Sequence, residues 1–445
     1  MSRPRPGHFL ALCHVAIVVT GLAYGAWRLE ELQASQRLPT PQREPRPIVA
    51  RHHDPSLIAR ERLRRILARL QPRFAGRRPK INHIDHALRM WGAEATFDEP
   101  DCLSGAELRA LLLDHRAFAE AWGPTTKPFL IPDTTGRGDL DFRTRGGPAT
   151  ASHVDHTLAC LAEVGTPTDF PVQTPRGELP LQAAIEHALT GFSLNQEEYE
   201  WSTLVWLHYL PHVREWVSHE GQRITWDRLA DRLMRQRLSQ GVCFGQHRLM
   251  SLAALLQRDD DVRYLSPGMR ARIVDHLRDA TARLEATQHA EGYWDGGWPG
   301  VEWDGSPLQS TGPLGVRADR ILSTGHVLEW WLYAPAEALP SETVLRRATD
   351  WLADELEQLT EDETRRYYPF LTHAGRALAL WHGQEPHRAL RAEVSANGAN
   401  HREPGAPSTT ADSADGGAPV SSTSEMDPEF DRGADILGKN RTNRR

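Results

Sequence analysis

The sequence predicts an all-α fold, an α/α toroid of about six helical hairpins preceded by one N-terminal transmembrane helix. Two observations on residues 55–391 predict the toroid. One is a recurring apolar helix pattern, and the other is a set of amphipathic segments that alternate with it. In each repeat an apolar residue is followed by apolar or packing-compatible residues at +3, +4 and +7, the spacing of one helix face. The six repeats begin at Ile84, Val154, Trp201, Leu249, Val327 and Ala374. No long strand-like stretch competes with this pattern.

The transmembrane prediction comes from residues 9–27, an uncharged stretch with arginines before it. Its length suffices to cross the hydrocarbon core of a bilayer as a helix. The arginine excess on the N-terminal side predicts a single-pass membrane protein with an extracytoplasmic main domain. A cleaved signal peptide is the alternative, because Ala23-Tyr24-Gly25 offers a small-x-small cleavage site.

Composition divides the rest of the chain. Residues 1–30 are assigned to the anchor or signal peptide, and residues 31–54, rich in Pro, Gln and Arg, to a linker. Residues 55–391 form the predicted toroid domain. Residues 392–445 contain few large apolar side chains and are predicted to be a disordered tail. The sequence does not predict an oligomeric state.

Six amphipathic segments lie between or before the apolar helices. A helix that is apolar nearly all round is expected inside a domain, and one with a single apolar stripe outside. The alternation therefore predicts an inner and an outer ring, with an open solenoid as the alternative. Ring closure is favoured because there are six apolar repeats, and because the amphipathic helix of residues 55–71 can complete the outer ring. The segments are roughly 55–71, 105–121, 178–191, 225–240, 266–289 and 341–359.

Histidines mark the predicted start of five inner helices, and glutamates mark the sixth. Helices of one ring run in parallel, so we expect these side chains to converge at one mouth. Positive helix ends favour anions there and lower the pKa of nearby histidines. The alternative is a structural role beside helix caps. The residues are His83, His86, His153, His156, His247, His326 and His373, with Glu197, Glu198 and Glu200 on the sixth helix.

No motif predicts a metal or a cofactor. His-x-Asp-His occurs twice, but HExxH, CxxC, a phosphate-binding glycine loop and GxSxG are absent from the sequence. Cys160 and Cys243 are predicted to be small buried apolar groups. The net charge of −7 argues against a general nucleic-acid binder.

One local motif resembles the QW repeat of the terpenoid cyclase and protein prenyltransferase superfamily. It is Leu284-x3-Gln288-x3-Gly292-x-Trp294. The resemblance implies an α/α toroid, in which the glutamine and the tryptophan tie a helix end to the following turn. The Asp-rich acid motif of squalene cyclases is missing, and no match to the zinc ligands of the prenyltransferases is found. The resemblance therefore implies the fold and not the chemistry.

A second motif, Gly325-His326-x2-Glu329-Trp330, resembles the GHxxEW segment of the N-acylglucosamine 2-epimerase and aldose-ketose isomerase family. The resemblance implies that His326 and Glu329 lie in a sugar pocket and that a histidine near the C-terminal end joins the acid/base chemistry. His373 is the candidate for that histidine. Proton transfer next to a carbonyl needs a base and an acid on opposite sides of the substrate, which opposing inner helices can provide.

These observations predict a toroid with a His/Glu-lined mouth that binds a small molecule, either carbohydrate or isoprenoid-like. The sequence leaves catalysis open, and a non-catalytic scaffold at the membrane is the alternative. The candidate catalytic residues are His326, Glu329, His373 and His247. The candidate substrate-binding residues are His153, His156, Glu198, Trp294 and Trp298. The two tryptophans lie in a glycine-rich insertion, where such rings either stack on sugars or pin the loop to the body.

Overall fold

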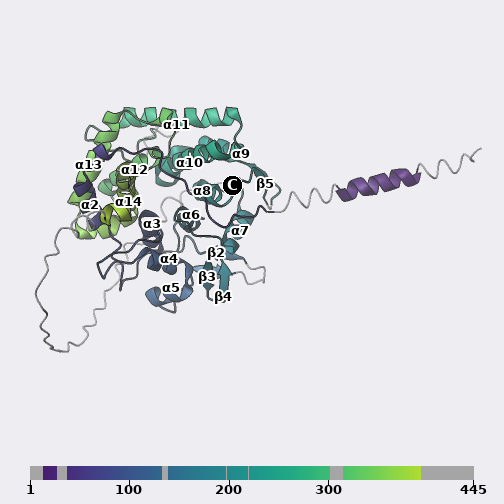
Figure 1. Cartoon of the computed structure of the whole chain (residues 1–445), viewed down its shortest axis with the longest axis horizontal. Coiled ribbons are helices and arrows are strands. Elements are labelled where there is room, and N and C mark those ends of the chain that lie inside the picture. The colour runs from purple at the N-terminus through teal and green to yellow at the C-terminus, as the bar shows by residue number, and fades with distance from the viewer. Residues whose placement is uncertain are drawn as a thin grey trace, which may run out of the picture.

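The computed structural model describes residues 14–27, 38–132, 139–196, 198–218, 220–300 and 314–391. This part of the chain is mostly helical, which confirms the predicted all-α class (Figure 1). The predicted tail, residues 392–445, lies outside the described residues.

Six helices, called the inner helices below, contain the predicted apolar repeats, except that Val154 of the second repeat precedes its helix and is 41% exposed. Most of their residues are buried, and in α8 every residue is. Each inner helix packs against the next along the chain, and the last packs back against the first. The contacts between the inner helices therefore close in a cycle. The inner helices are α3 (Ile81–Trp91), α6 (His156–Glu163), α8 (Glu200–Tyr209), α10 (Gln246–Val262), α12 (Val316–Trp331) and α14 (Glu361–Trp381).

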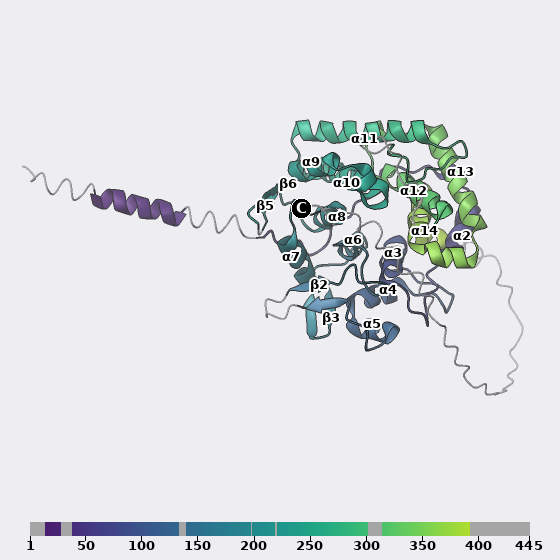
Figure 2. The same ribbon diagram turned by 180° about the vertical axis from the view of Figure 1, so that it is seen from behind.

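The amphipathic helices lie on the outside of these six (Figure 2). In α9, for example, the buried residues Trp226, Leu229, Ala230 and Leu233 follow the spacing of one helix face. The helices are α2 (Arg60–Arg69), α4 (Gly105–Leu113), α5 (His115–Trp122), α7 (Gln182–Gly191), α9 (Trp226–Arg235), α11 (Pro267–Thr287), α13 (Glu342–Gln358) and α15 (Pro386–Arg391). Short 3₁₀ turns are η1 (Pro55–Leu57), η2 (Leu238–Gln240), η3 (Val242–Gly245) and η4 (Ala336–Ala338).

Three short antiparallel strand pairs were not predicted. Each strand has only three or four residues, too few for a two-residue alternation to stand out in the sequence. The pairs lie in segments that connect helices. They are β1 (Leu130–Pro132) with β2 (Leu140–Phe142), β3 (Pro171–Thr174) with β4 (Gly177–Pro180), and β5 (Glu215–Val217) with β6 (Arg223–Thr225).

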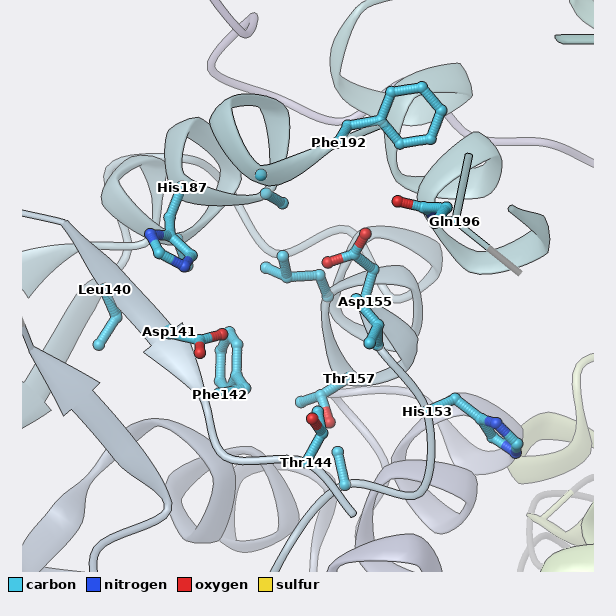
Figure 3. A pocket seen from close by; sticks show the side chains of 16 residues that line it. Leu140, Asp141, Phe142, Thr144, His153, Asp155, Thr157, His187, Phe192 and Gln196 are labelled. Atoms are coloured by element: carbon cyan, nitrogen blue, oxygen red, sulfur yellow. The ribbon is translucent and has the colours of Figure 1, made fainter. Parts of the chain in front are cut away.

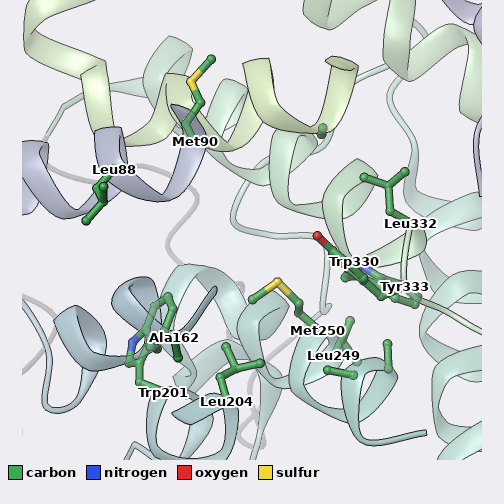
Figure 4. Close-up of a cluster of buried hydrophobic side chains, with 14 of the residues drawn as sticks. Leu88, Met90, Ala162, Trp201, Leu204, Leu249, Met250, Trp330, Leu332 and Tyr333 are labelled. Carbon is green, nitrogen blue, oxygen red and sulfur yellow. The ribbon is translucent and has the colours of Figure 1, made fainter. Parts of the chain in front are cut away.

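The hydrophobic core is continuous from the inner to the outer helices. Figure 4 shows part of it, with Leu88 of α3, Trp201 of α8, Leu249 of α10 and Trp330 of α12 among the buried side chains. Large side chains from neighbouring inner helices thus fill the space between them.

The segment of residues 38–54, which we call the strap, lies against the C-terminal ends of inner helices. Backbone N–H groups of Gln42, Arg51 and Asp54 donate to the carbonyls of Tyr209 (2.9 Å), Leu332 (2.7 Å) and Trp381 (2.6 Å). These carbonyls belong to the ends of α8, α12 and α14, where the helix itself provides no partner. The described part of the predicted linker is therefore hydrogen-bonded to the domain.

The predicted membrane span and single-pass localisation are wrong. Residues 14–27 do form a helix, but within the described ranges no helix is both long and apolar enough to cross a bilayer. A span needs about 20 consecutive apolar residues. Residues 9–13 of the predicted span lie outside the described part of the chain.

Candidate functional site

Five histidines from five inner helices converge in the interior; we call them the histidine centre. The imidazole rings of His326 and His373 lie 3.7 Å apart between centroids, and those of His247 and His326 4.6 Å apart. On the other side, His86 lies 4.7 Å from His156 and 5.2 Å from His373. All five rings are buried. His86, His156, His247, His326 and His373 therefore converge as predicted, but in the buried interior and not at an open mouth.

The position of two histidines along their helices differs from the prediction. His326 and His373 lie well inside α12 and α14, because these helices begin earlier than expected, at Val316 and Glu361. The field of a helix N-terminus falls off within the first turn. Burial, rather than the helix end, therefore sets the protonation state of these two rings.

Acceptors fix the orientation of four of the rings. The carboxylate of Asp85 lies 2.9 Å from His86 Nδ1 through one oxygen and 2.9 Å from His156 Nδ1 through the other. Glu329 Oε2 lies 2.7 Å from His373 Nδ1, and the Leu322 carbonyl lies 2.8 Å from His326 Nδ1. An ionised carboxylate or a carbonyl can only accept, so each Nδ1 carries the proton in the neutral ring and each Nε2 keeps a lone pair. Arg89 Nη1, which can only donate, also lies 3.1 Å from His373 Nδ1, but it is closer to Glu329, at 2.8 Å, and donates there.

Burial keeps four of the five histidines neutral. It lowers the pKa of His156 and of His326 to about 4, and the pKa values of His247 and His373 lie well below the ordinary value for the same reason. Burial acts to raise the pKa of Glu329, but Arg89 and His373 outweigh it and hold that pKa well below its usual range. The centre therefore combines neutral imidazoles with an ionised carboxylate.

Two arginines, the buried Arg89 and the largely buried Arg376, balance the carboxylates. Arg89 of α3 lies 2.9 Å from Glu163 of α6 and 2.8 Å from Glu329 of α12. Arg376 of α14 lies 2.6 Å from Glu329. The pairs join four inner helices. Sequence reasoning missed both arginines, although each follows a histidine of the centre by three residues, one turn along the same face.

A left-handed turn precedes α10 beside His247. Cys243 (φ 49°, ψ 49°) and Phe244 (φ 58°, ψ 33°) both adopt the conformation that normally needs glycine. The Cys243 Sγ and one ring nitrogen each of His247 and His326 lie within 4.8 Å of one another. Cys243, predicted to be a small buried apolar group, is only partly buried. The sequence signal for its place beside His247 is their spacing of four residues.

Several candidate residues lie outside the centre. His83 faces away from it, with its Nε2 3.2 Å from the Arg365 carbonyl. His153 Nδ1 lies 3.1 Å from Glu198, which also pairs with Arg145. Glu200 is buried against Arg248 at 2.7 Å. Glu197 lies outside the described residues.

Trp294 and Trp298 are buried in packing. The Trp294 Nε1–H donates to the Leu284 carbonyl at 2.8 Å, and the Gln288 amide donates to the Gly292 carbonyl at 2.9 Å. The local tie that the QW-like motif implies is thus present. With 1% and 2% of their surface exposed, the two rings offer no free face on which a sugar could stack in this arrangement.

A cavity of about 190 Å³ lies between β2, α7 and the start of α6 (Figure 3). Asp141, Asp155, His187 and His153 line it together with apolar side chains. Burial raises the pKa of Asp155 to about 6. Thr157 lines the cavity and its hydroxyl lies 3.4 Å from Asp85, so this cavity adjoins the histidine centre.

Comparison of the chain with protein-family models, with curated proteins and with solved structures finds no match. The function is therefore inferred from the geometry of the site.

Proposed function

We propose that this chain is an α/α-toroid protein whose ring interior moves protons on a small polar molecule. The cyclic contacts of the inner helices support the toroid. The observation that carries the chemistry is the pair Glu329–His373, whose Oε2 and Nδ1 lie 2.7 Å apart. Glu329 holds His373 in the tautomer whose Nε2 can accept a proton, the role that a carboxylate plays beside a catalytic histidine.

The ring beside His373 is that of His326, on the neighbouring helix. Because their ring centroids are only 3.7 Å apart, a substrate does not fit between the two rings. The geometry therefore favours proton removal and return on one face of a substrate over transfer between opposite faces. Among reactions next to a carbonyl, one-face transfer is suited to aldose–ketose isomerisation, and two-face transfer to epimerisation. The resemblance of Gly325–Trp330 to the GHxxEW segment supports a sugar substrate.

Substrate access requires movement. His326 and His373 are at most 2% exposed, so a sugar reaches the Nε2 atom of His373 only after neighbouring side chains shift. The same burial favours a second candidate function, a non-catalytic scaffold in which the centre only holds the inner helices together.

The test is hydrogen exchange at C2 of added aldoses in deuterated water, followed by NMR. We expect exchange with ketose formation, and a decrease of about 10²–10⁴-fold in His373→Gln, the usual contribution of a general base. His83→Gln, which changes a histidine outside the centre, is the control and should retain exchange. Absence of exchange with every aldose, or exchange undiminished in His326→Ala and His373→Gln, would leave the scaffold as the function. Formation of the C2 epimer in place of the ketose would contradict the one-face geometry.

A further inference from the structure

The start of α10 brings a thiol and two imidazoles together in the interior. One ring nitrogen each of His247 and His326 and the Sγ of Cys243 lie within 4.8 Å of one another. The two Nε2 atoms are 3.0 Å apart. Two nitrogen ligands on one tetrahedral zinc ion lie about 3.3 Å apart, as Zn–N bonds of about 2.0–2.1 Å require. Small ring rotations therefore suffice to place both nitrogens on one ion.

The backbone before α10 is strained where it positions the thiol. Two consecutive non-glycine residues, Cys243 and Phe244, have left-handed φ/ψ angles, each at a cost of about 1–2 kcal/mol. Strain of this kind clusters at binding and catalytic sites. Gly245 continues the turn at φ 79°, and a Cβ there would lie 2.6 Å from the Leu238 carbonyl oxygen. Three consecutive residues, 243–245, therefore have left-handed backbone angles, and packing of apolar side chains does not by itself require such a turn.

Polar atoms without a partner gather at the same turn. Both side-chain polar atoms of Gln246 and the Nδ1 of His247 are buried and make no hydrogen bond to the described protein. Buried polar atoms are rarely left without a partner. Beside Cys243, Gln246 and His247 thus keep hydrogen-bonding capacity that the described protein groups do not fill.

Two other groups of possible ligands are already satisfied internally. In Asp85–His86–His156 the carboxylate oxygens accept from the two Nδ1 atoms, and in His326–Glu329–His373 Glu329 accepts from His373. The thiol of Cys243 has no such partner among the described hydrogen bonds. The Leu322 carbonyl meanwhile holds His326 with its Nε2 turned toward His247, as the outer partner of a metal-binding histidine does.

We propose that Cys243, His247 and His326 bind one zinc ion. A thiolate with two imidazoles suits zinc, whereas magnesium and calcium prefer oxygen ligands. Three protein ligands leave the fourth tetrahedral position to water or to a substrate oxygen, the arrangement of catalytic zinc. The zinc site is an inference beyond the proposed proton transfer. The two can be tested separately, because metal uptake can be measured without any substrate.

The experiment uses Co²⁺ as a spectroscopic probe on chelator-treated full-length protein. We expect one equivalent of Co²⁺ to give the ligand-field bands of a tetrahedral ion and a thiolate-to-cobalt charge-transfer band, and Zn²⁺ to displace it. Cys243→Ser should lose the charge-transfer band. Cys160→Ser is the matched control, because Cys160 is buried beside His156 outside the proposed ligand set, and it should keep the band. Absence of stoichiometric binding, or a band that survives in Cys243→Ser, overturns the proposal.

A second measurement covers the case in which Cys243→Ser does not fold. In the unsubstituted protein, Zn²⁺ should slow alkylation of Cys243 by at least tenfold, as followed by peptide mass spectrometry. Cys102, a partly exposed free cysteine far from the proposed ligands in sequence, serves as the internal reference and should react at an unchanged rate. Equal alkylation of Cys243 with and without Zn²⁺ overturns the site. Loss of C2 exchange with intact metal binding would reject only the proton-transfer proposal.

Discussion

At the scale of single residues, the stability of the interior depends on pairing each buried charge with an opposite one. Glu329 is fully buried and accepts contacts from Arg89, His373 and Arg376. Removing one partner of a buried network leaves the other charges without compensation, which costs more than the network contributes as a whole. The neutral histidines follow the same logic, since burial penalises their charged form.

Glu329→Gln should destabilise the domain strongly. The substitution leaves Arg89 and Arg376 short of one buried counter-charge, and breaking a buried pair typically costs about 3–5 kcal/mol. Urea denaturation followed by circular dichroism measures the change. Glu342→Gln, which removes the carboxylate from a surface pair with Arg346, is the control and should leave the midpoint nearly unchanged. Equal midpoints for the two variants would contradict the importance of the buried network.

His208 gives a pH-dependent prediction. Burial lowers its pKa to about 4, with Glu163 and the Arg46 carbonyl opposing and Arg258 and Arg376 adding to the effect. The unfolded chain protonates this residue near pH 6.5, before the folded chain does. The stability that neutral His208 allows is therefore complete above about pH 6.5 and is lost as the pH falls toward 4, by up to about 3 kcal/mol.

His208→Gln should therefore flatten the loss of stability between pH 6.5 and pH 4. The glutamine amide can still donate to the Arg46 carbonyl, so the change tests titration more than packing. Denaturation midpoints over this range give the slope, and His212→Gln, at an exposed position, is the control. An unchanged slope in His208→Gln would refute the assignment.

At the scale of elements, the inner helices were predictable and the turns between them were not. Apolar side chains three and four residues apart mark a buried helix face whatever surrounds it. The extra turns of α12 and α14 were missed because their first residues, such as Arg317 and Glu361, are polar and face other helices or solvent. The left-handed angles at Cys243 and Phe244 have no glycine to signal them.

Convergence of the histidines was predictable from their phase, and their partners only in part. Asp85 stands next to His86, within a repeated His-x-Asp-His pattern. Arg89 and Arg376 pair with Glu163 and Glu329 from other helices, and no local rule predicts which helices become neighbours. Pairing between residues this far apart in the sequence can be identified only from the three-dimensional structure.

The turn of Cys243–Gly245 should be intolerant of substitution at its glycine. Gly245→Ala places a Cβ at positive φ and 2.6 Å from the Leu238 carbonyl oxygen, so we expect a loss of about 1–3 kcal/mol. Thermal unfolding measures it. Gly268→Ala in α11 is the matched control, because a Cβ there meets nothing within 4 Å and alanine favours a helix. A Gly245→Ala variant as stable as Gly268→Ala would contradict the described turn.

At the scale of the whole molecule, the strap holds distant helices together. It contacts the ends of α8, α12 and α14, and the Gln257 side chain of α10 binds Val49 through both its amide atoms, accepting at 2.9 Å and donating at 2.7 Å. The prediction of a linker rested on composition, which does not show whether backbone groups find partners.

Gln257→Ala should loosen the strap. Both hydrogen bonds to Val49 are lost, and we expect trypsin to cleave after Arg51 several-fold faster than in the unsubstituted protein. Cleavage after Arg223, within the β5–β6 hairpin, is the internal reference and should be unaffected. Strap cleavage that stays at the original rate would show that Gln257 does not hold the segment.

The strap also constrains when the molecule can be completed during synthesis. Its residues leave the ribosome early, yet His52 meets the Ala334 carbonyl across 282 residues of sequence, and Asp54 meets Trp381 on the last inner helix. Contacts this distant must wait until nearly the whole domain has been translated, since domains fold as their chain emerges. Until then the end of α12 keeps an unpaired carbonyl, so complete docking of the strap follows assembly of the cyclic helix contacts.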